Sequence, residues 1–308
     1  MNISVGALRA LPKSFGLLMG LGLLAAFVPQ PGHAQSLYGE AFAIPSESDN
    51  RRKANMAARQ IMLIERMVEL ACFVHLDVER EAHHQQLDFA KSLYEATEEA
   101  LKNGNPTLGL PRESNERLIA ALADVDRRYA PFGEVLQAGL SSGFTAEIVA
   151  DLEHHTGLIE SALHKVLRLV EAVYLQSEVD LQTLSAFNFV TKERTDTQRL
   201  IKDMCLIAAQ IEAEAKAVEL AYEVEAFEAR LVSMIKGEPL IGLPPAPTDG
   251  IRTTVKEAQE IWLEIRPLVE EELRTGKLDQ ASLLDVAEHA TPLLAKMNKA
   301  VFLYESLN

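Results

Sequence analysis

Residues 104–111 read Gly-Asn-Pro-Thr-Leu-Gly-Leu-Pro, and residues 237–244 read Gly-Glu-Pro-Leu-Ile-Gly-Leu-Pro. Both stretches fit the pattern Gly-x-Pro-x-x-Gly-Leu-Pro, at an offset of 133 in the numbering. Glycine supplies the left-handed conformation that ends many helices, and proline prevents a helix from continuing. Each copy follows one apolar-periodic stretch and precedes another, so the pattern predicts that one helical unit occurs twice.

The spacing of apolar residues predicts four helices in each unit. Those expected in the first unit cover residues 49–75, 79–102 and 114–138, with a fourth after the turn at 141–143, and the last helix of the second unit covers about 281–307. Almost no stretch alternates with the period of two that indicates a strand. We therefore predict an all-α protein of two tandem antiparallel four-helix bundles, formed by residues 49–185 and 186–308.

The junction between the two bundles has no glycine or proline from Leu158 to Lys236. One interpretation is that the last helix of the first bundle continues into the first helix of the second, which would make a rigid rod. The alternative is a turn near residues 187–189, since periodic patterns much longer than about 25 residues are exceptional. The sequence leaves both open.

Residues 1–34 have the features of an export signal. Arg9 and Lys13 precede an apolar run from Phe15 to Val28, and a small-residue cleavage site ends at Ala34. The run is short for an uncleaved membrane anchor, because a bilayer needs about 20 apolar residues. We expect cleavage after Ala34, release into the periplasm, and a flexible leader over residues 35–48.

The composition is that of an acidic globular protein. Apolar residues make up 48%, and 45 acidic residues outnumber 30 basic ones, which gives a net charge of −15. This charge argues against nucleic acid or anionic membrane surfaces as partners. Cys72 and Cys205 would both lie in apolar helical stretches, where a free cysteine packs as a small hydrophobic residue. We therefore expect two free thiols, with a disulfide as the alternative in an oxidising compartment.

Catalytic and metal-binding patterns are absent from the sequence. The pairs His83-His84 and His154-His155 would point about 100° apart on a helix, so each offers at most one metal ligand per face. No phosphate-binding loop, dinucleotide fingerprint or nucleophile motif is present. We expect no enzyme, no cofactor and no metal. The large or flexible apolar residues expected in the core instead are Met62, Met67, Tyr129, Met204, Trp262 and Met297.

A family resemblance rests on the first predicted helix. Residues 55–67 read Asn-Met-Ala-Ala-Arg-Gln-Ile-Met-Leu-Ile-Glu-Arg-Met. They resemble the signature Ala-Gly-Arg-Gln-Arg-Met-Leu-Ser-Gln-Arg-Met of the PilJ-type N-terminal sensor domain of type IV pili methyl-accepting chemotaxis transducers. Residues 197–200 resemble residues 59–62 at an offset of 138, and the Gly-Leu-Pro loops fit the same domain. The resemblance covers nearly all of the chain after residue 34, once per copy.

This resemblance implies a periplasmic helical sensor related to the nitrate and nitrite sensing domains of NarX-like histidine kinases. In such kinases, arginines of the first helix clamp the anion across a dimer interface, because a guanidinium donates two parallel hydrogen bonds to an oxyanion. The clamping position falls on Ile61 in the first copy and Arg199 in the second. The second arginine of the signature falls on Arg66 and Met204.

The two copies can form a composite anion site if they stack as an internal pair. The predicted ligand-binding residues are Arg59, Gln60, Arg66, Gln198 and Arg199. The alternative is that the arginines pair with acidic residues three or four positions away, as solvated helix neighbours, the candidates being Glu65, Glu69, Asp196 and Asp203.

These observations predict a non-enzymatic periplasmic sensor, associated with chemotaxis or type IV pili. It would bind a small ligand, for example an oxyanion such as nitrate or nitrite, and relay its state to a separate membrane signalling protein. The alternative is an envelope scaffold or interaction protein whose duplicated sensor fold has lost ligand binding.

Overall fold

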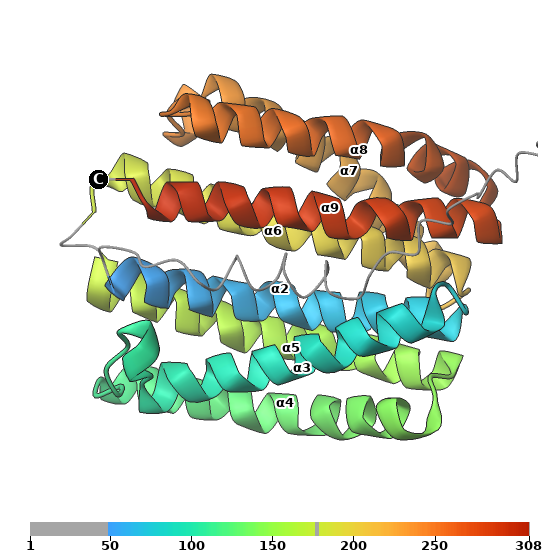
Figure 1. Ribbon diagram of the computed structural model, residues 1–308, viewed down its shortest axis with the longest axis horizontal. Helices are drawn as coiled ribbons and strands as arrows, with labels where there is room; N and C mark the ends of the chain where they lie inside the picture. The colour runs from blue at the N-terminus through green and yellow to red at the C-terminus, as the bar shows by residue number, and fades with distance from the viewer. Residues whose placement is uncertain (1–48, 176–178, 308) are drawn as a thin grey trace, which may run out of the picture. The chain divides into compact units, whose positions relative to one another are not determined.

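The computed structural model describes residues 49–175 and 179–307 (Figure 1). These residues form long α-helices and no strand, which confirms the all-α prediction. None of the helices in these two ranges is both long and apolar enough to cross a membrane. The predicted export signal and leader occupy residues 1–48 and lie outside the described residues.

The same order of elements occurs twice. The first repeat consists of α2 (Asp49–His75), α3 (Arg80–Asn103), the 3-10 turn η1 (Pro106–Leu108), α4 (Glu116–Ser142) and α5 (Ala146–Val170). The second consists of α6 (Leu181–Ala208), α7 (Ala213–Lys236), the 3-10 turn η3 (Pro239–Ile241), α8 (Asp249–Thr275) and α9 (Gln280–Glu305). Each repeat therefore has the four predicted helices, within a few residues of the expected bounds.

The two Gly-x-Pro-x-x-Gly-Leu-Pro loops have the same conformation. Gly104 and Gly237 have φ of 79° and 80°, and a Cβ at Gly104 would lie 2.5 Å from a backbone nitrogen. An isolated β-bridge closes each loop, between Asn105 and Leu110 and between Glu238 and Leu243. Only glycine fits the first position of each loop, because it has no Cβ and tolerates positive φ.

The ends of α2 and α6 fix the register between the repeats. Asp77 and Glu79 after α2, and Gln210 and Glu212 after α6, have positive φ at matching positions. The offset between these pairs is 133, as it is between the two loops, and both helices are continuous. The sequence-based offset of 138 for the first helices is therefore wrong, and Arg66 is the structural equivalent of Arg199.

Helices α2 and α6 join the two bundles side by side. α2 packs against α3 and α5 of its own repeat and against α6, while α6 packs against α7, α9 and α2. Contacts join Asn55 to Arg194, Glu65 to Arg199 and Cys72 to Cys205. The residue numbers of the partners increase along both helices, so α2 and α6 run parallel. Residues 56–74 of α2 are all buried, as expected for a helix covered on every side.

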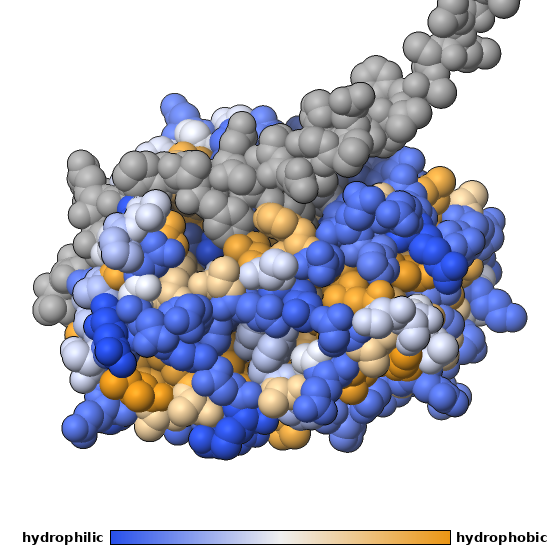
Figure 2. Space-filling model, turned by 60° about the horizontal axis from the view of Figure 1, so that its bottom comes forward, coloured by the Kyte–Doolittle hydropathy of each residue, from blue (hydrophilic) through white to orange (hydrophobic). Residues whose placement is uncertain are grey.

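The core contains the side chains predicted for it, except that Tyr129 is half-buried at its edge. The four methionines expected there, Met62, Met67, Met204 and Met297, are buried. The rings of Tyr94 and Tyr129 stack at 4.4 Å in the first repeat, and those of Phe227 and Trp262 meet edge to face at 5.0 Å at the equivalent positions of the second. Hydrophilic residues predominate on the face shown in Figure 2, with smaller apolar patches between them.

The junction between the repeats differs from both predicted alternatives. α5 ends at Val170 and continues as a π-helical turn, η2 (Glu171–Leu175). α6 begins anew at Leu181, where the Asp180 carboxylate accepts hydrogen bonds from two backbone N–H groups of the first turn. The helix is therefore not continuous, and residues 187–189 lie within α6 rather than in a turn. A capping aspartate, which needs no glycine or proline, begins the new helix.

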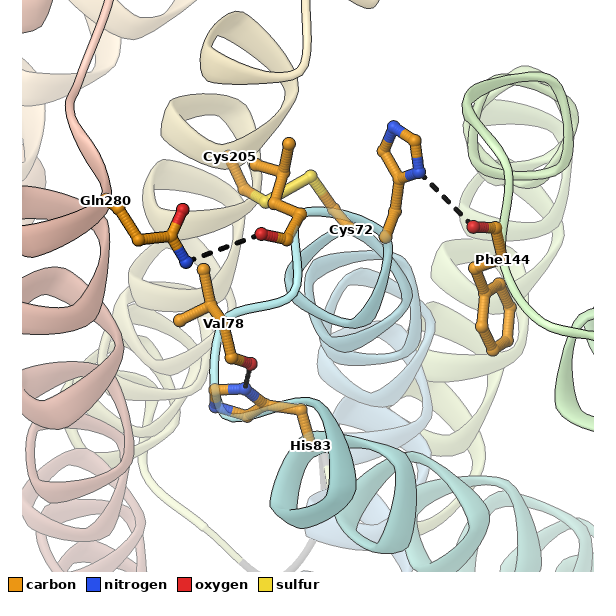
Figure 3. The surroundings of a disulfide bond; sticks show 8 residues. Cys72, Val78, His83, Phe144, Cys205 and Gln280 are labelled. Carbon is orange, nitrogen blue, oxygen red and sulfur yellow. Dashed lines mark hydrogen bonds between the residues drawn. A yellow bond between two sulfur atoms is a disulfide. The ribbon is translucent and has the colours of Figure 1, made fainter.

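The prediction of two free thiols is wrong, because Cys72 and Cys205 form a disulfide (Figure 3). Both residues are fully buried, and their Cα atoms lie 6.1 Å apart, within the range that a disulfide requires. The parallel packing of α2 and α6 brings the cysteines together. Next to them, His83 donates from Nδ1 to the Val78 carbonyl oxygen at 2.6 Å and stabilises the turn after α2.

Removing the disulfide should lower the stability of the α2–α6 pair. We expect the double variant Cys72→Ala/Cys205→Ala to lose about 2–5 kcal/mol of unfolding free energy in urea, because the bond closes a long loop in the unfolded chain. Reduction of the wild-type protein should have a similar effect, and a reducing agent should leave the variant unchanged. Equal urea midpoints for the oxidised and reduced wild type would contradict this.

Candidate functional site

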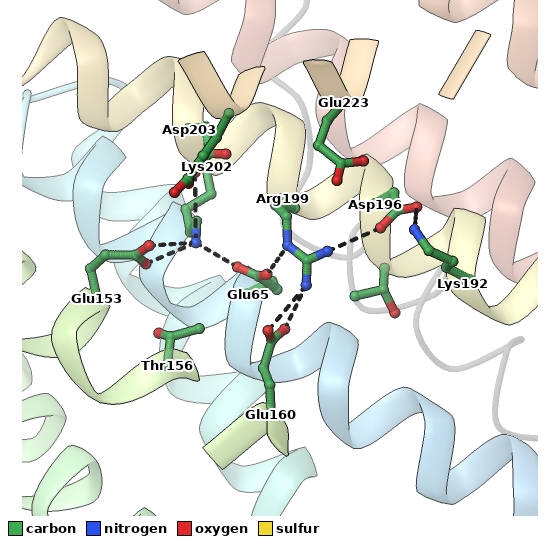
Figure 4. A network of polar contacts seen from close by, with 12 residues as sticks. Glu65, Glu153, Thr156, Glu160, Lys192, Asp196, Arg199, Lys202, Asp203 and Glu223 are labelled. Carbon is green, nitrogen blue, oxygen red and sulfur yellow. Dashed lines mark hydrogen bonds and ion pairs between the residues drawn. The ribbon is translucent and has the colours of Figure 1, made fainter. Parts of the chain in front are cut away.

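A buried charged cluster lies between α2 and α6, centred on Glu65 of α2 (Figure 4). The Glu65 carboxylate is fully buried and accepts from Arg199 Nε at 2.6 Å. It also pairs with Lys202 Nζ at 2.8 Å. Two cations of the second repeat thus contact one carboxylate of the first.

Arg199 is held by carboxylates from three helices. Besides Glu65 of α2, its Nη2 donates to both oxygens of Glu160 on α5, at 2.9 and 3.1 Å, and its Nη1 donates to Asp196 on α6 at 3.2 Å. Burial lowers the pKa of Arg199, but Glu65 and Glu160 outweigh it and raise the pKa above its usual value. The guanidinium therefore serves as the centre of an internal ion-pair network.

The cluster extends along α6 in both directions. Lys202 also contacts both oxygens of Glu153 on α5 at 2.8 Å, and Lys216 of α7 pairs with the same carboxylate. Toward the start of α6, Arg230 of α7 donates to Asp196 at 2.7 Å and pairs with Glu193. The network therefore joins α5, α6 and α7, and links both repeats through α2.

The acidic groups of the cluster have opposite pKa shifts. Burial raises the pKa of Glu160 and of Glu193 to about 8, and that of Asp203 to about 7. For Glu65, burial acts in the same direction, but the charges of Lys202 and Arg199 outweigh it and hold its pKa at about 2. A hydrogen bond joins Glu160 to Glu65, so Glu160 takes up a proton at a higher pH than Glu65 does.

Arg66, the structural equivalent of Arg199, has different partners. It pairs with Glu69 and donates from Nη2 to Gln86 Oε1 at 2.8 Å and to Thr291 Oγ1 at 2.9 Å. Arg66 therefore contacts α3 and α9, whereas Arg199 contacts α5. The structure does not bring these two predicted ligand-binding residues together in one pocket.

The two predicted glutamines are buried in different surroundings. Gln60 donates from Nε2 to the Tyr94 carbonyl oxygen at 3.0 Å and to Glu98 at 3.2 Å. Gln198 is fully buried, and neither of its amide atoms has a hydrogen-bond partner within residues 49–175 and 179–307. Gln60 thus supports the packing of α2 on α3, while Gln198 faces the interior without a fixed contact.

A second pair of arginines lies near the start of α2. Arg59 and Arg194 are both buried, and the pKa of Arg194 falls to about 9, first through burial and then through the charge of Arg59, against an opposing effect of the Glu305 carboxylate. Burial lowers the pKa of Arg59 to about 10, against an opposing effect of Glu305. Arg194 Nη1 donates to Asn55 Oδ1 at 2.8 Å, and Asn55 donates to Glu305 at 2.6 Å.

The sequence analysis missed Arg194. The offset of 133 was available from the loops, and at this offset Arg194 occupies the position of Ile61. The Gln-Arg dipeptide at residues 198–199 instead suggested an offset of 138, since it repeats part of residues 59–62. Given the loop offset, the sequence would have predicted both Arg194 and the equivalence of Arg66 with Arg199.

A comparison with protein families finds a match over residues 185–287. These residues match the family described as type IV pili methyl-accepting chemotaxis transducer N-terminal domain, PilJ. The match begins inside α6 and ends inside α9, so it supports a PilJ-type helical domain, of a sensor family, in the second repeat. No curated protein and no solved structure matches the chain.

The shifted carboxyl groups predict how stability depends on pH. Groups with raised pKa values bind more protons in the folded chain than in the unfolded one between about pH 4.5 and 8. Their contribution is therefore full at lower pH and is lost as the pH rises through 7 to 8. We expect the unfolding free energy in urea to fall by about 1–3 kcal/mol between pH 7 and pH 8.5. This range lies above the one in which the buried His83, whose pKa burial lowers to about 4, acts in the opposite direction.

The variant Glu160→Gln should reduce this pH dependence, because the amide resembles the protonated carboxyl group. Glu147→Gln, on the exposed side of the same helix, is the matched control and should leave the slope unchanged. A wild-type stability that rises with pH over this range would show that these carboxyl groups are not held in their protonated form.

Proposed function

We propose that this protein is a non-enzymatic sensor-type helical-bundle protein of the periplasm. It binds a small oxyanion between α2 and α6 and relays its state to a separate membrane signalling protein. The PilJ-type match in the second repeat supports a sensor of the chemotaxis transducer kind. The repeated order of helices and loops supports a second PilJ-type copy in the first repeat. The relation to NarX-like sensing domains rests on the sequence resemblance alone.

The corrected register strengthens the case for an anion site. The clamping position of the resembled family, Ile61 in the first copy, corresponds to Arg194 in the second, and the other signature arginine corresponds to Arg66 and Arg199. The second copy therefore has both arginines, five residues apart on α6. In this internal pair, α2 takes the place of the partner subunit's helix.

The observation that carries the proposal is that Arg194 is buried with hydrogen-bond donors that have no partner among the described residues. Its side chain is buried, and Nε and Nη2 have no hydrogen-bond partner in the part of the chain that the structure describes. Leaving the donors of a buried cation unmet costs free energy, and an oxyanion would satisfy both. Arg59 of α2 is near enough for its charge to act on Arg194, so an anion here would contact both repeats.

This position suits a relay between helices. The disulfide fixes α2 to α6 at residues 72 and 205, and on α2 this point lies about 20 Å along the helix from Arg59. Binding between Arg59 and Arg194 would therefore change the helix spacing at one end while the other end stays fixed. Such a movement is a means of signalling to a partner protein.

Thermal unfolding with nitrate, nitrite, sulfate and phosphate, each against chloride at equal ionic strength, tests the site. A bound anion at 100 times its dissociation constant stabilises the fold by about 2.7 kcal/mol, so the midpoint should rise. Arg194→Met should abolish that rise, because it removes the two donors that would bind the anion. Arg117→Met, exposed on α4, is the control and should keep the rise.

A second candidate function is an envelope scaffold or interaction protein. The observation that favours it is the pairing of Arg66 and Arg199 with side chains of the protein itself, as in a structural network. If no oxyanion raises the midpoint of the wild type, the sensor proposal fails and the scaffold is the better account.

A further inference from the structure

A separate cavity lies between α5 and α6, and α2 contributes part of its floor. Its volume is about 200 Å³, enough for a molecule with a few non-hydrogen atoms. The floor is apolar and is formed by Ala58, Ile61 and Leu167. Polar side chains from Asn188 to Arg199 line one wall, over about 16 Å of helix. The π-helical turn η2 contributes Glu171, and such turns are frequent at functional sites.

The polar groups at the Asn188 end of the cavity are hydrogen-bond acceptors. Asn188 Oδ1 is buried and has no partner within the described ranges, while the amide of Asn188 is hydrogen-bonded to Glu171. The hydroxyl groups of Thr191 and Thr195 donate to backbone carbonyl oxygens of α6, at 3.0 and 3.3 Å. Their remaining capacity is therefore to accept.

The cations that line the cavity, Lys192 and Arg199, already have partners. Lys192 pairs with Asp196, and Arg199 contacts Glu65, Glu160 and Asp196. Burial raises the pKa of Glu171, against opposing effects of Asn188 and of Arg168, so this carboxyl group would gain from a further cation. A ligand that only accepts hydrogen bonds, such as nitrate, would leave Asn188 Oδ1 without a donor and would bring no further cation to Glu171.

We propose that this cavity binds a small primary aliphatic amine. Its ammonium group would donate to Glu171, Asn188 Oδ1 and Thr191 Oγ1, because three N–H donors match three acceptors. Its short alkyl chain would lie on Ala58, Ile61 and Leu167. A second ammonium group would approach Lys192 and Arg199, so the site favours a monoamine over a diamine. This site is distinct from the proposed oxyanion site at Arg194.

Isothermal titration of the full chain with n-butylammonium tests the proposal, with butyrate and the diammonium ion of putrescine as comparisons. We expect saturable binding of butylammonium, at least tenfold weaker binding of the diamine, and none of butyrate. Binding of butyrate equal to that of butylammonium, or no binding of butylammonium at millimolar concentration, would overturn the proposal.

Variants locate the site. Glu171→Gln should weaken butylammonium binding at least tenfold. Ala58→Leu should block binding, because the larger side chain fills the floor of the cavity. Asn188→Asp keeps an acceptor and should retain binding. Glu147→Gln is the matched control on α5. Each variant must show the helical circular dichroism and cooperative unfolding of the wild type. Binding that is unchanged in both Glu171→Gln and Ala58→Leu would place the amine elsewhere and contradict the proposal.

The two sites can fail independently. A nitrate effect that depends on Arg194 but is accompanied by no amine binding would overturn only the amine site. Amine binding without any oxyanion effect would overturn only the oxyanion site. If neither the oxyanion effect nor amine binding is observed, the envelope scaffold is the better account.

Discussion

The carboxylate of Glu65 is the constraint on which the arrangement of the two repeats depends. It is fully buried, and a buried charge is tolerated only when it is paired and hydrogen-bonded. Its partners, Arg199 and Lys202, both come from α6. A shift of α6 by one residue would rotate both cations away from α2, so this contact specifies the register in which Cys72 meets Cys205. The disulfide then fixes that register covalently.

Two copies in one chain make an interface whose sides differ. The backbone is nearly the same on both sides, as the matching loops and helix ends show. The side chains are not: Glu65 of α2 corresponds to Gln198 of α6, and Arg66 and Arg199 have different partners. In an interface between identical subunits, every contact would occur twice. Here one side has become a network of ion pairs, while Arg194 near the start of α2 retains unmet donors.

Local signals in the sequence predicted much of the fold. The paired loops gave the duplication because glycine and proline act on their own segment of chain, and apolar spacing gave the helices and the buried methionines. The disulfide could not be predicted, because nothing local shows that two positions so far apart in the sequence are neighbours. The junction was also missed, since Asp180 begins a helix without any glycine or proline.

The candidate site was predictable only in part. The sequence identified arginines of the first helices, but whether each meets a carboxylate or an open space depends on how the helices pack. Arg199 meets three carboxylates, one of them on α5, whereas Arg194 meets Asn55 and keeps two groups unpaired. The change of offset from 138 to 133 decides which arginine of α6 corresponds to each position of α2.

A double-mutant cycle between Glu65 and Arg199 tests the central claim most directly. The unfolding free energies of the wild type, Glu65→Gln, Arg199→Gln and the double variant would be measured in urea at pH 7. If Glu65 holds α2 against α6 through this contact, the double variant should be less destabilised than the two single variants together, by at least about 1.5 kcal/mol. Single-variant effects that add to within about 0.5 kcal/mol would contradict the account, because independent sites behave in that way.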